Sequence, residues 1–366
     1  MEKQEQALSL NREKIKNLQT EALVLLKQLI AIPSFSKEED KTASVIYSFL
    51  SVHGVQANRI NNNIWATNKY YDENKPTILL NSHHDTVKPI TSYTKDPFTA
   101  IEEKGKLFGL GSNDAGASLV SLIGTFLYFH ELHDLKFNLV IAATGEEEIS
   151  GKNGVESLLP NIPGITCAIV GEPTLMQMAI AERGLMVLDC LTTGRAGHAA
   201  RNEGENAIYK AVKDIEWIQN YNFKNSSDLL GPVKMAVTSI ETENKAHNVI
   251  PSECKFIVDI RVNELYSLEE VLQTIKNNVS STIRPRSMRI RSSMIPLEHP
   301  LVKAGLTLGR NYYGSPTTSD KALISVPALK LGPGDSARSH TADEFIYIEE
   351  IHEGIEIYIQ LLNQLL

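Results

Sequence analysis

The sequence of 366 residues has few cysteines, no long apolar segment and no excess of basic residues. The three cysteines, Cys167, Cys190 and Cys254, form no Cys-x-x-Cys pair and lie in apolar, strand-like segments. We therefore interpret them as reduced, buried thiols of a cytoplasmic protein and not as metal ligands. Residues 1–20 lack the apolar stretch of a secretion signal, and no apolar run approaches the ~20 residues that span a bilayer. The formal net charge of −8 argues against nucleic acid as a partner, and we expect no membrane partner.

The composition is that of a folded protein with real cores. Apolar residues make up 42% of the chain and charged residues 22%, which is ordinary for a soluble protein. The length exceeds that of a typical single domain, so two domains are expected. The sequence contains no internal repeat and no low-complexity segment.

The order of the expected elements predicts an α/β domain interrupted by an inserted domain. Helices are expected over 21–30 and 39–52, and strands and helices then alternate up to Pro173, as in a mostly parallel sheet wrapped by helices. A β-α-β-β-α order follows, typical of a small α+β sandwich of the ferredoxin-like kind. Its expected strands cover 185–191, 233–240 and 255–261, and its helices 206–220 and 267–279. A last helix is expected over 348–365. The predicted domains are 1–177 with 290–366, and the insertion 178–289.

Histidines and acids follow several expected strands of the first domain. They are His83 after residues 79–82, Asp114 in the glycine-rich turn 108–116, Glu146-Glu147-Glu148 after 139–145, Glu172 after 168–171, and His340 near the C-terminal end. In an open α/β sheet, ligands bind at the carboxyl ends of the strands. Two histidines with several carboxylates suit a borderline metal, with zinc as first choice. The sequence therefore predicts a metalloenzyme.

Eight motifs in this order resemble the M20 family of zinc peptidases and deacylases, which includes acetylornithine deacetylase and succinyl-diaminopimelate desuccinylase. The first four are Ser82-His83-His84-Asp85-Thr86-Val87, Gly109-Leu110-Gly111-Ser112-Asn113-Asp114, Glu146-Glu147-Glu148-Ile149-Ser150-Gly151 and Gly171-Glu172-Pro173-Thr174. The others are Gly194-Arg195-Ala196-Gly197-His198, Asn248-Val249-Ile250-Pro251 with Asp259-Ile260-Arg261, Thr318-Ser319-Asp320 and Ser339-His340-Thr341. The resemblance covers residues 21–365. One departure is Gly116, where the family usually has a lysine.

The resemblance implies two zinc ions, for which cobalt could substitute. One zinc would be bound by His83, Asp114 and Glu172, and the other by Asp114, Glu148 and His340, with Asp114 bridging. Glu147 would be the base that moves protons, and Asp85 would orient a ligand imidazole. Residues two apart in a strand face the same side, which favours His83 over His84 as the ligand beside Asp85. Ile149 and Gly151 match the family pattern that puts the base at Glu147, although a shift by one residue stays open.

For the inserted domain, the resemblance implies a homodimer. The matching histidine, His198, would reach the neighbouring subunit's active site and stabilise the oxyanion of the tetrahedral intermediate. Asn248 and Arg261 would contact the substrate, with Arg261 as a bidentate partner of an α-carboxylate. Thr318, Ser319 and Asp320 would line the same pocket.

Residues 112–117, 182–185 and 332–344 most resemble the acetylornithine deacetylase group. This implies hydrolysis of the amide between a small acyl group and an amino acid's nitrogen. The expected substrate is N-acetylornithine, N-acetylcitrulline or a succinylated counterpart, in arginine biosynthesis. Three alternatives stay open: a metallo-aminopeptidase or dipeptidase, a hydrolase that frees lysine from a carrier protein, and a non-catalytic dimeric binding protein. Glu172, where the family's aminopeptidases often have aspartate, disfavours the first, and the complete set of ligand and base positions disfavours the third.

Overall fold

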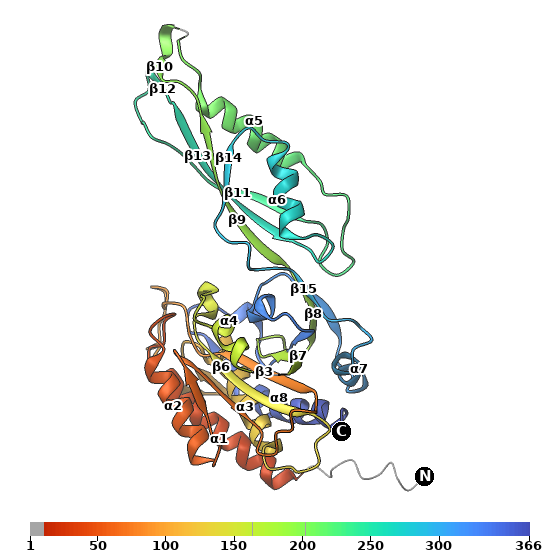
Figure 1. Cartoon of the computed structure of the whole chain (residues 1–366). Coiled ribbons are helices and arrows are strands. Elements are labelled where there is room, and N and C mark those ends of the chain that lie inside the picture. The colour runs from red at the N-terminus through yellow and green to blue at the C-terminus, as the bar shows by residue number, and fades with distance from the viewer. Residues whose placement is uncertain (1–10, 163, 202) are drawn as a thin grey trace. The chain divides into compact units, whose positions relative to one another are not determined.

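The computed structural model describes residues 11–162, 164–201 and 203–366 and divides into two compact units (Figure 1). The first unit contains the described residues up to Ile180 together with 295–313 and 319–366. The second contains residues 181–294 and 314–318. The second unit thus begins at Ala181. The sequence analysis begins the inserted domain at residue 178.

The large sheet has parallel strands at its centre and antiparallel strands at its flanks. Its order begins β1-β2-β6-β3-β7-β17-β8. The parallel strands are β6 (Asn138–Thr144), β3 (Thr77–His83), β7 (Ile165–Val170) and β17 (Ala328–Lys330). The antiparallel strands are β1 (Asn58–Ile60), β2 (Asn63–Thr67) and β8 (Met178–Glu182). Strand β8 also pairs with β15 (Ser293–Met294) and β16 (Tyr312–Ser315). The predicted α/β class is confirmed, and the sheet is mixed because its flanking strands reverse direction.

Helical layers bury both faces of this sheet. Helix α3 (Ala117–Phe129) packs on β3 and β6, and α1 (Arg12–Ile30) and α8 (Ile348–Asn363) pack on α3. On the other face, Leu79 and Val140 share a core with α4 (Val155–Leu158). Helix α2 (Asp40–Val52) contacts α1 and β2, and α7 (Pro300–Thr307) contacts α8. Every residue of β3 and β6 is consequently buried, which explains their continuous apolar runs.

A small antiparallel sheet brings two distant segments of the first unit together. Its strands are β4 (Ile101–Glu103), β5 (Lys106–Phe108) and β18 (Phe345–Tyr347), in the order β18-β5-β4. Strand β5 leads directly into the turn that carries Asp114, and β18 follows His340 by a few residues. The pairing of β5 with β18 therefore anchors both candidate ligands to one local structure.

The second unit is a four-stranded antiparallel sheet with two helices. Its strands are β9 (Gly184–Thr193), β11 (Lys234–Thr242), β13 (Glu253–Val262) and β14 (Thr282–Pro285), in the order β11-β13-β9-β14. Helices α5 (Ala207–Asn220) and α6 (Leu268–Lys276) share a core with this sheet, which includes Phe256 of β13 and Val271 of α6. A short pair, β10 (Gly197–His198) and β12 (Val249–Ile250), lies outside this sheet. The chain order β9-α5-β11-β13-α6-β14 contains the predicted β-α-β-β-α order and adds a last strand, β14, that the sequence analysis did not predict.

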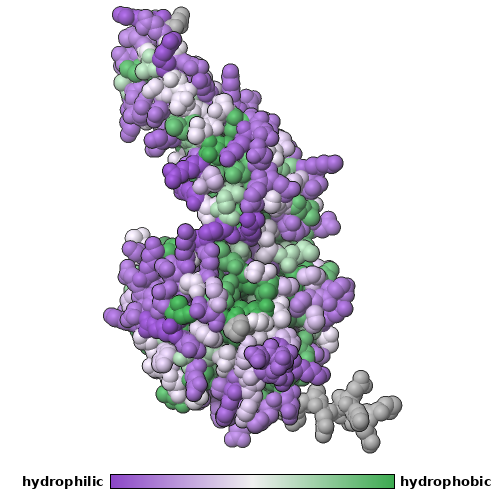
Figure 2. All heavy atoms as spheres, in the orientation of Figure 1, coloured by the Kyte–Doolittle hydropathy of each residue, from purple (hydrophilic) through white to green (hydrophobic). Residues whose placement is uncertain are grey.

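Helix α1 is longer than expected, since it begins at Arg12 and not at residue 21. Asn11 caps it by accepting the backbone N–H of Lys14 (3.0 Å), and Ile15 and Leu18 are buried. Among the described residues, no helix combines the length and the apolar character that a membrane crossing requires. Hydrophilic residues prevail on the face of each unit that Figure 2 shows.

Candidate metal centre

The predicted ligands converge at the carboxyl-end edge of β3, β6 and β7. His83 ends β3, Glu148 follows β6, and Glu172 follows β7. They form two groups that share one residue: His83, Asp114 and Glu172, and Asp114, Glu148 and His340. Within each group the potential ligand atoms lie within 4.8 Å of one another. Five side chains from five separate segments of the first unit thus form two adjoining donor sets.

The two carboxylate oxygens of Asp114 face different histidines. Oδ1 lies 3.2 Å from Nε2 of His83, and Oδ2 lies 3.8 Å from Nε2 of His340. The remaining acids complete the groups, with Glu172 Oε1 3.8 Å from His83 Nε2 and Glu148 Oε2 3.1 Å from His340 Nε2. A carboxylate that points one oxygen into each group is the geometry a bridging ligand needs.

The two donor groups have the chemistry of a site for divalent cations. Burial opposes protonation of His83, but hydrogen bonds to Asp114 and Asp85 outweigh it and raise the pKa of His83 well above its ordinary value. Burial also opposes ionisation of Asp114, yet His83 outweighs it and lowers the pKa of Asp114. A hydrogen bond with Glu148 raises the pKa of His340 to about 9. Imidazole nitrogens and carboxylate oxygens held this close are the ligands zinc prefers.

Glu147 lies beside the first group. Its Oε2 is 3.9 Å from His83 Nε2, and its side chain is 12% exposed. Burial is the main reason why the pKa of Glu147 is raised well above its ordinary value, and nearby carboxylates such as Glu172 add to the effect. A carboxyl group in this setting can hold a proton near neutral pH, which proton transfer requires.

Asp85 supports both the histidine and the acidic loop. Its Oδ1 lies 3.4 Å from His83 Nδ1, which also contacts the backbone oxygen of Asp85 at 2.9 Å. The same carboxylate accepts the backbone N–H groups of Glu147 (3.0 Å) and Glu148 (3.1 Å) and the hydroxyl of Ser36 (2.7 Å). Burial opposes ionisation of Asp85, but His83 and Ser36 outweigh it and lower its pKa. This is the arrangement that an orienting role requires.

The neighbouring residues His84 and Glu146 face elsewhere. The ring nitrogens of His84 lie 2.9 Å from the hydroxyl of Thr42 and 2.9 Å from the backbone oxygen of Asn62. The carboxylate of Glu146 accepts the side-chain amide of Asn153 at 2.9 Å. In the part of the chain that the structure describes, neither residue belongs to a group of potential metal ligands.

Four other predicted site residues lie in the second unit, and their roles stay predictions. In the β10-β12 pair His198 lies opposite Val249, and the backbone oxygen of Asn248 accepts the N–H of Ala199 (3.0 Å). Arg261 already has an acidic partner, because its Nε and Nη2 donate to Asp259 at 2.8 and 3.1 Å. Thr318 donates its hydroxyl to a backbone oxygen at 3.2 Å.

Ser319 and Asp320 lie in the first unit, where Asp320 is 3% exposed. Its Oδ2 accepts the side-chain amide of Asn81 (3.0 Å) and the hydroxyl of Thr144 (2.8 Å). Asp320 thereby joins the ends of β3 and β6, just before His83 and the glutamate run. Ser319 caps the following turn through the N–H of Lys321 at 3.3 Å. Substrate contact by either residue stays a prediction.

Sequence reasoning missed two buried acids, Glu39 and Glu344, that hold the ligand-bearing loops. Glu39 accepts the backbone N–H of Glu146 at 3.1 Å and the side-chain amide of Asn62 at 2.7 Å. Glu344 accepts backbone N–H groups of the turn that carries Asp114, and burial raises the pKa of Glu344 to about 8. Their sequence signals are weak: Glu39 begins an expected helix, and Glu344 follows His340 by four positions.

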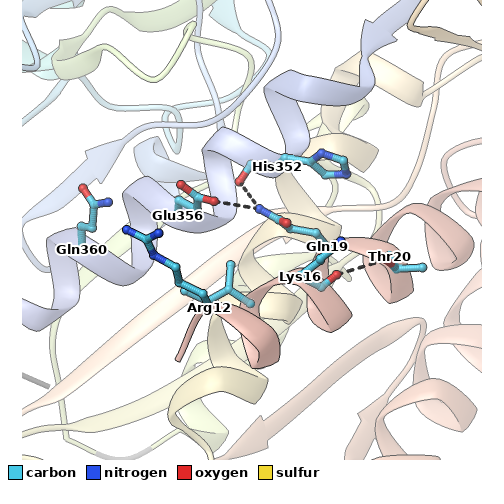
Figure 3. Close-up of a pocket in the computed structure, with 8 residues that line it drawn as sticks. Arg12, Lys16, Gln19, Thr20, His352, Glu356 and Gln360 are labelled. Atoms are coloured by element: carbon cyan, nitrogen blue, oxygen red, sulfur yellow. Dashed lines mark hydrogen bonds between the residues drawn. The ribbon is translucent and has the colours of Figure 1, made fainter. Parts of the chain in front are cut away.

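A surface groove lies between α1 and α8 (Figure 3). Within its lining, the amide of Gln19 donates to the backbone oxygen of His352 and to Glu356, both at 3.2 Å. None of the predicted ligands lines this groove. The candidate metal ligands therefore lie at the strand ends and in their loops, and not in this groove.

The fold and the paired donor groups define a metal-dependent hydrolase. Peptidase family M20/M25/M40 matches residues 79–364, and the chain belongs to this family. Succinyl-diaminopimelate desuccinylase 2 of Ruegeria sp. (strain TM1040) is 29% identical over 276 residues, which cover 69% of this chain and 68% of the relative. Succinyl-diaminopimelate desuccinylase of Rickettsia bellii (strain OSU 85-389) is 25% identical over 376 residues, covering 93% and 96%.

Solved structures of similar fold include two peptidases. Aminopeptidase PepT from Bacillus cereus has a TM-score of 0.78 at 16% identity, covering 95% of this chain and 98% of its own. The YXEP protein of Bacillus subtilis, described as a dinuclear metal-binding peptidase of the M20 family, has a TM-score of 0.74 at 16% identity with the same coverage. At this identity the likeness concerns the fold alone.

Proposed function

We propose that this hydrolase cleaves the amide bond between a small acyl group and the amino nitrogen of an amino acid, with succinyl as the acyl group. The two curated relatives described above are named for a succinylated substrate. Succinyl therefore replaces acetyl as the first candidate. The expectation of N-acetylornithine and arginine biosynthesis finds no support in these relatives.

The observation that carries the proposal is the position of Asp114 between the two donor groups. His83 and Glu172 would hold one zinc with Asp114, and Glu148 and His340 the other. Such a pair of ions supplies polarisation of the amide carbonyl and a water molecule acidic enough to attack near neutral pH.

The chain's own residues would then move the proton. Glu147, whose Oε2 lies beside His83, would take the proton of the attacking water and deliver it to the leaving amine nitrogen. Asp85 would hold the His83 ring through Nδ1 and keep Glu147 in place through its backbone N–H. Asp85 is fully buried and only 12% of the Glu147 side chain is exposed, which limits the access of bulk water to both groups.

We also propose that the second unit forms a homodimer. Strand β11 lies at the edge of its sheet, and Ile240 on it is 52% exposed. On α5, Tyr209 is 70% and Val212 50% exposed. Exposed apolar side chains next to an open strand edge favour a protein partner, and a second copy gives a closed assembly.

The test combines metal content with a substrate panel. Zinc-reconstituted protein would be assayed on N-succinyl-diaminopimelate, N-succinylornithine, N-acetylornithine, N-acetylcitrulline and an unmodified dipeptide. We expect kcat/KM for the best succinylated substrate to exceed that for the acetylated ones by about tenfold or more, because an added charged contact discriminates by 1.4 kcal/mol or more. Faster cleavage of the dipeptide would instead support a peptidase. Glu147→Gln protein with the same metal content serves as the control for contaminating hydrolases.

A further inference from the structure

The side chain of Glu344 is a carboxyl group buried inside the protein next to the metal centre. The residue is 2% exposed. Both of its oxygens accept backbone N–H groups from one turn: Oε2 accepts that of Gly111 at 3.1 Å, and Oε1 accepts those of Asn113 at 2.8 Å and Asp114 at 2.9 Å. Glu344 is therefore bonded directly to the backbone of the residue that faces both donor groups.

The same turn is attached to the segment around His340 at further points. The backbone oxygen of Glu344 accepts the N–H of Gly109 at 3.0 Å. The Asn113 side chain donates to the backbone oxygen of Asp335 (3.1 Å) and to Ser339 (3.3 Å), and it accepts the N–H of Asp335 (3.0 Å). These contacts join a turn near residue 113 to a segment more than two hundred positions away.

Burial of a carboxylate is costly unless hydrogen bonds compensate for the lost water. The three N–H donors compensate in part, and they do so only in one backbone conformation of the turn. Glutamine has nearly the same shape but a single acceptor oxygen, so one side of the turn would lose its acceptor and meet an NH₂ group instead. A neutral isostere therefore perturbs the turn without removing packing volume.

We propose that Glu344 is a positioning residue of the metal centre. It fixes the backbone of Asp114 so that Oδ1 and Oδ2 face the two histidines, and it couples that turn to His340, four positions before it in the chain. This inference rests on the proposed function, because it requires the donor groups to bind metal.

A purely structural role would give a different result, and a matched control separates the two. Asp214 in the second unit is also a buried carboxylate, 5% exposed, that accepts the backbone N–H groups of Ser280 (3.0 Å) and Ser281 (2.8 Å). Asp214→Asn makes the same chemical change as Glu344→Gln in the other unit. Both variants should lower the midpoint of thermal unfolding of the metal-free protein, since each leaves buried N–H groups with a poorer acceptor.

The readout is zinc affinity, measured by competition with a chromophoric chelator on full-length protein. Glu344→Gln should weaken zinc binding by about 10- to 100-fold, as loss of a residue that supports a ligand typically does. Asp214→Asn should change it by less than about twofold, because Asp214 holds backbone groups of the second unit and sites that share no partners act independently. Glu344→Asp, which keeps the carboxyl group but is one methylene shorter, should lie between wild type and Glu344→Gln, and it replaces that variant if glutamine prevents folding.

Wild-type zinc affinity in folded Glu344→Gln, or in Glu344→Asp where it is the variant measured, would overturn the assignment while leaving the proposed function intact. Equal losses of zinc affinity in Glu344→Gln and Asp214→Asn would also overturn it, because the effect would then come from general destabilisation. Wild-type protein that binds no zinc would reject the proposed function, and the role of Glu344 with it.

Discussion

Strands of the two units are buried in different ways. All seven residues of β3 and all seven of β6 in the first unit are buried. In the second unit, buried and less buried residues alternate along β9 and β13. Charged residues differ accordingly: Arg286 and Asp189 of the second unit pair at 2.7 Å with about half of each side chain exposed, whereas His83 and Asp85 at the end of β3 are 1% and 0% exposed.

The difference shows where charged groups are costly to bury and therefore need a partner or a bound cation. A strand covered on both faces offers no solvent side, so charged groups at its end need partners or a cation. A strand with one wet face can carry its charges in water, where an ion pair contributes little. We therefore expect changes at the edge of β3 and β6 to alter metal binding and catalysis. Changes in the core of the second unit should alter stability.

The largest expected effect is that of Glu147→Gln, which should lower kcat by on the order of 10²–10⁴-fold, because the variant cannot take a proton. Its zinc content should equal that of wild type. Glu148→Gln should instead lose one of the two ions, because it lies 3.1 Å from His340 in the second donor group. Kinetics and elemental analysis of both variants check the comparison. Loss of an ion in Glu147→Gln, with both ions kept in Glu148→Gln, would mean that the assignment of base and ligand is wrong by one residue.

His198→Ala tests whether the second unit takes part in catalysis, although its strands have one partly exposed face. We expect kcat to fall by on the order of 10²–10³-fold with unchanged zinc content, as when an oxyanion donor is removed. If His198 serves a partner's site, mixing this variant with Glu147→Gln under subunit exchange should restore activity to roughly a quarter of wild type, since random hybrids contain one intact site. Proven exchange without recovery would assign His198 to its own chain or to no site.

The pH dependence of the metal-free protein should reflect the buried charges of the first unit. The pKa of His340 is raised from 6.5 to about 9, and that of Glu344 from 4.5 to about 8. Both groups bind more protons when folded, so their contribution to stability is present below the unfolded pKa and is lost as the pH rises through the folded one. We expect the free energy of unfolding to decrease between pH 6.5 and pH 9.

Urea unfolding of metal-free protein across this range is the measurement. His340→Asn should reduce the slope, and zinc should stabilise the protein more at the alkaline end, because metal binding displaces protons. A stability that stays level or rises over the same range would contradict the assignment of these shifts.

The smallest expected effect is that of Ile260→Val in the core of the second unit. Ile260 is fully buried on β13, and the loss of one methylene should lower the free energy of unfolding by about 1 kcal/mol. Zinc affinity should not change. Denaturant unfolding and zinc titration of the same sample check both parts, and a weakened zinc site would mean that the two units are energetically coupled.

The sequence was most informative where local patterns suffice. Buried runs that end in polar residues placed His83 and Glu172 at one edge, and the strand-like segments 185–191 and 255–261 predicted β9 and β13. It was least informative about groups whose partners lie far away. Nothing local marks Glu344 as the acceptor for a turn around Asn113, or Asp320 as a partner of Asn81 and Thr144, because these contacts depend on how distant segments pack.

The start of helix α1 and the direction of the flanking strands were not predicted for similar reasons. The first turns of α1 are rich in charge, so their apolar spacing is weak, yet Ile15 and Leu18 are buried. The antiparallel direction of β2 and β8 is set by pairing with their neighbours, which composition does not reveal.

The most direct test of the central claim is the zinc stoichiometry of wild type and three single variants. We expect two zinc ions per chain in wild type, one in Glu172→Gln and one in Glu148→Gln, since each variant damages one donor group. Asp114→Asn should lose tight binding at both sites, because its two oxygens face different histidines. At most one zinc in wild type, or two tightly bound ions in Asp114→Asn, would contradict a bridged pair of metal sites.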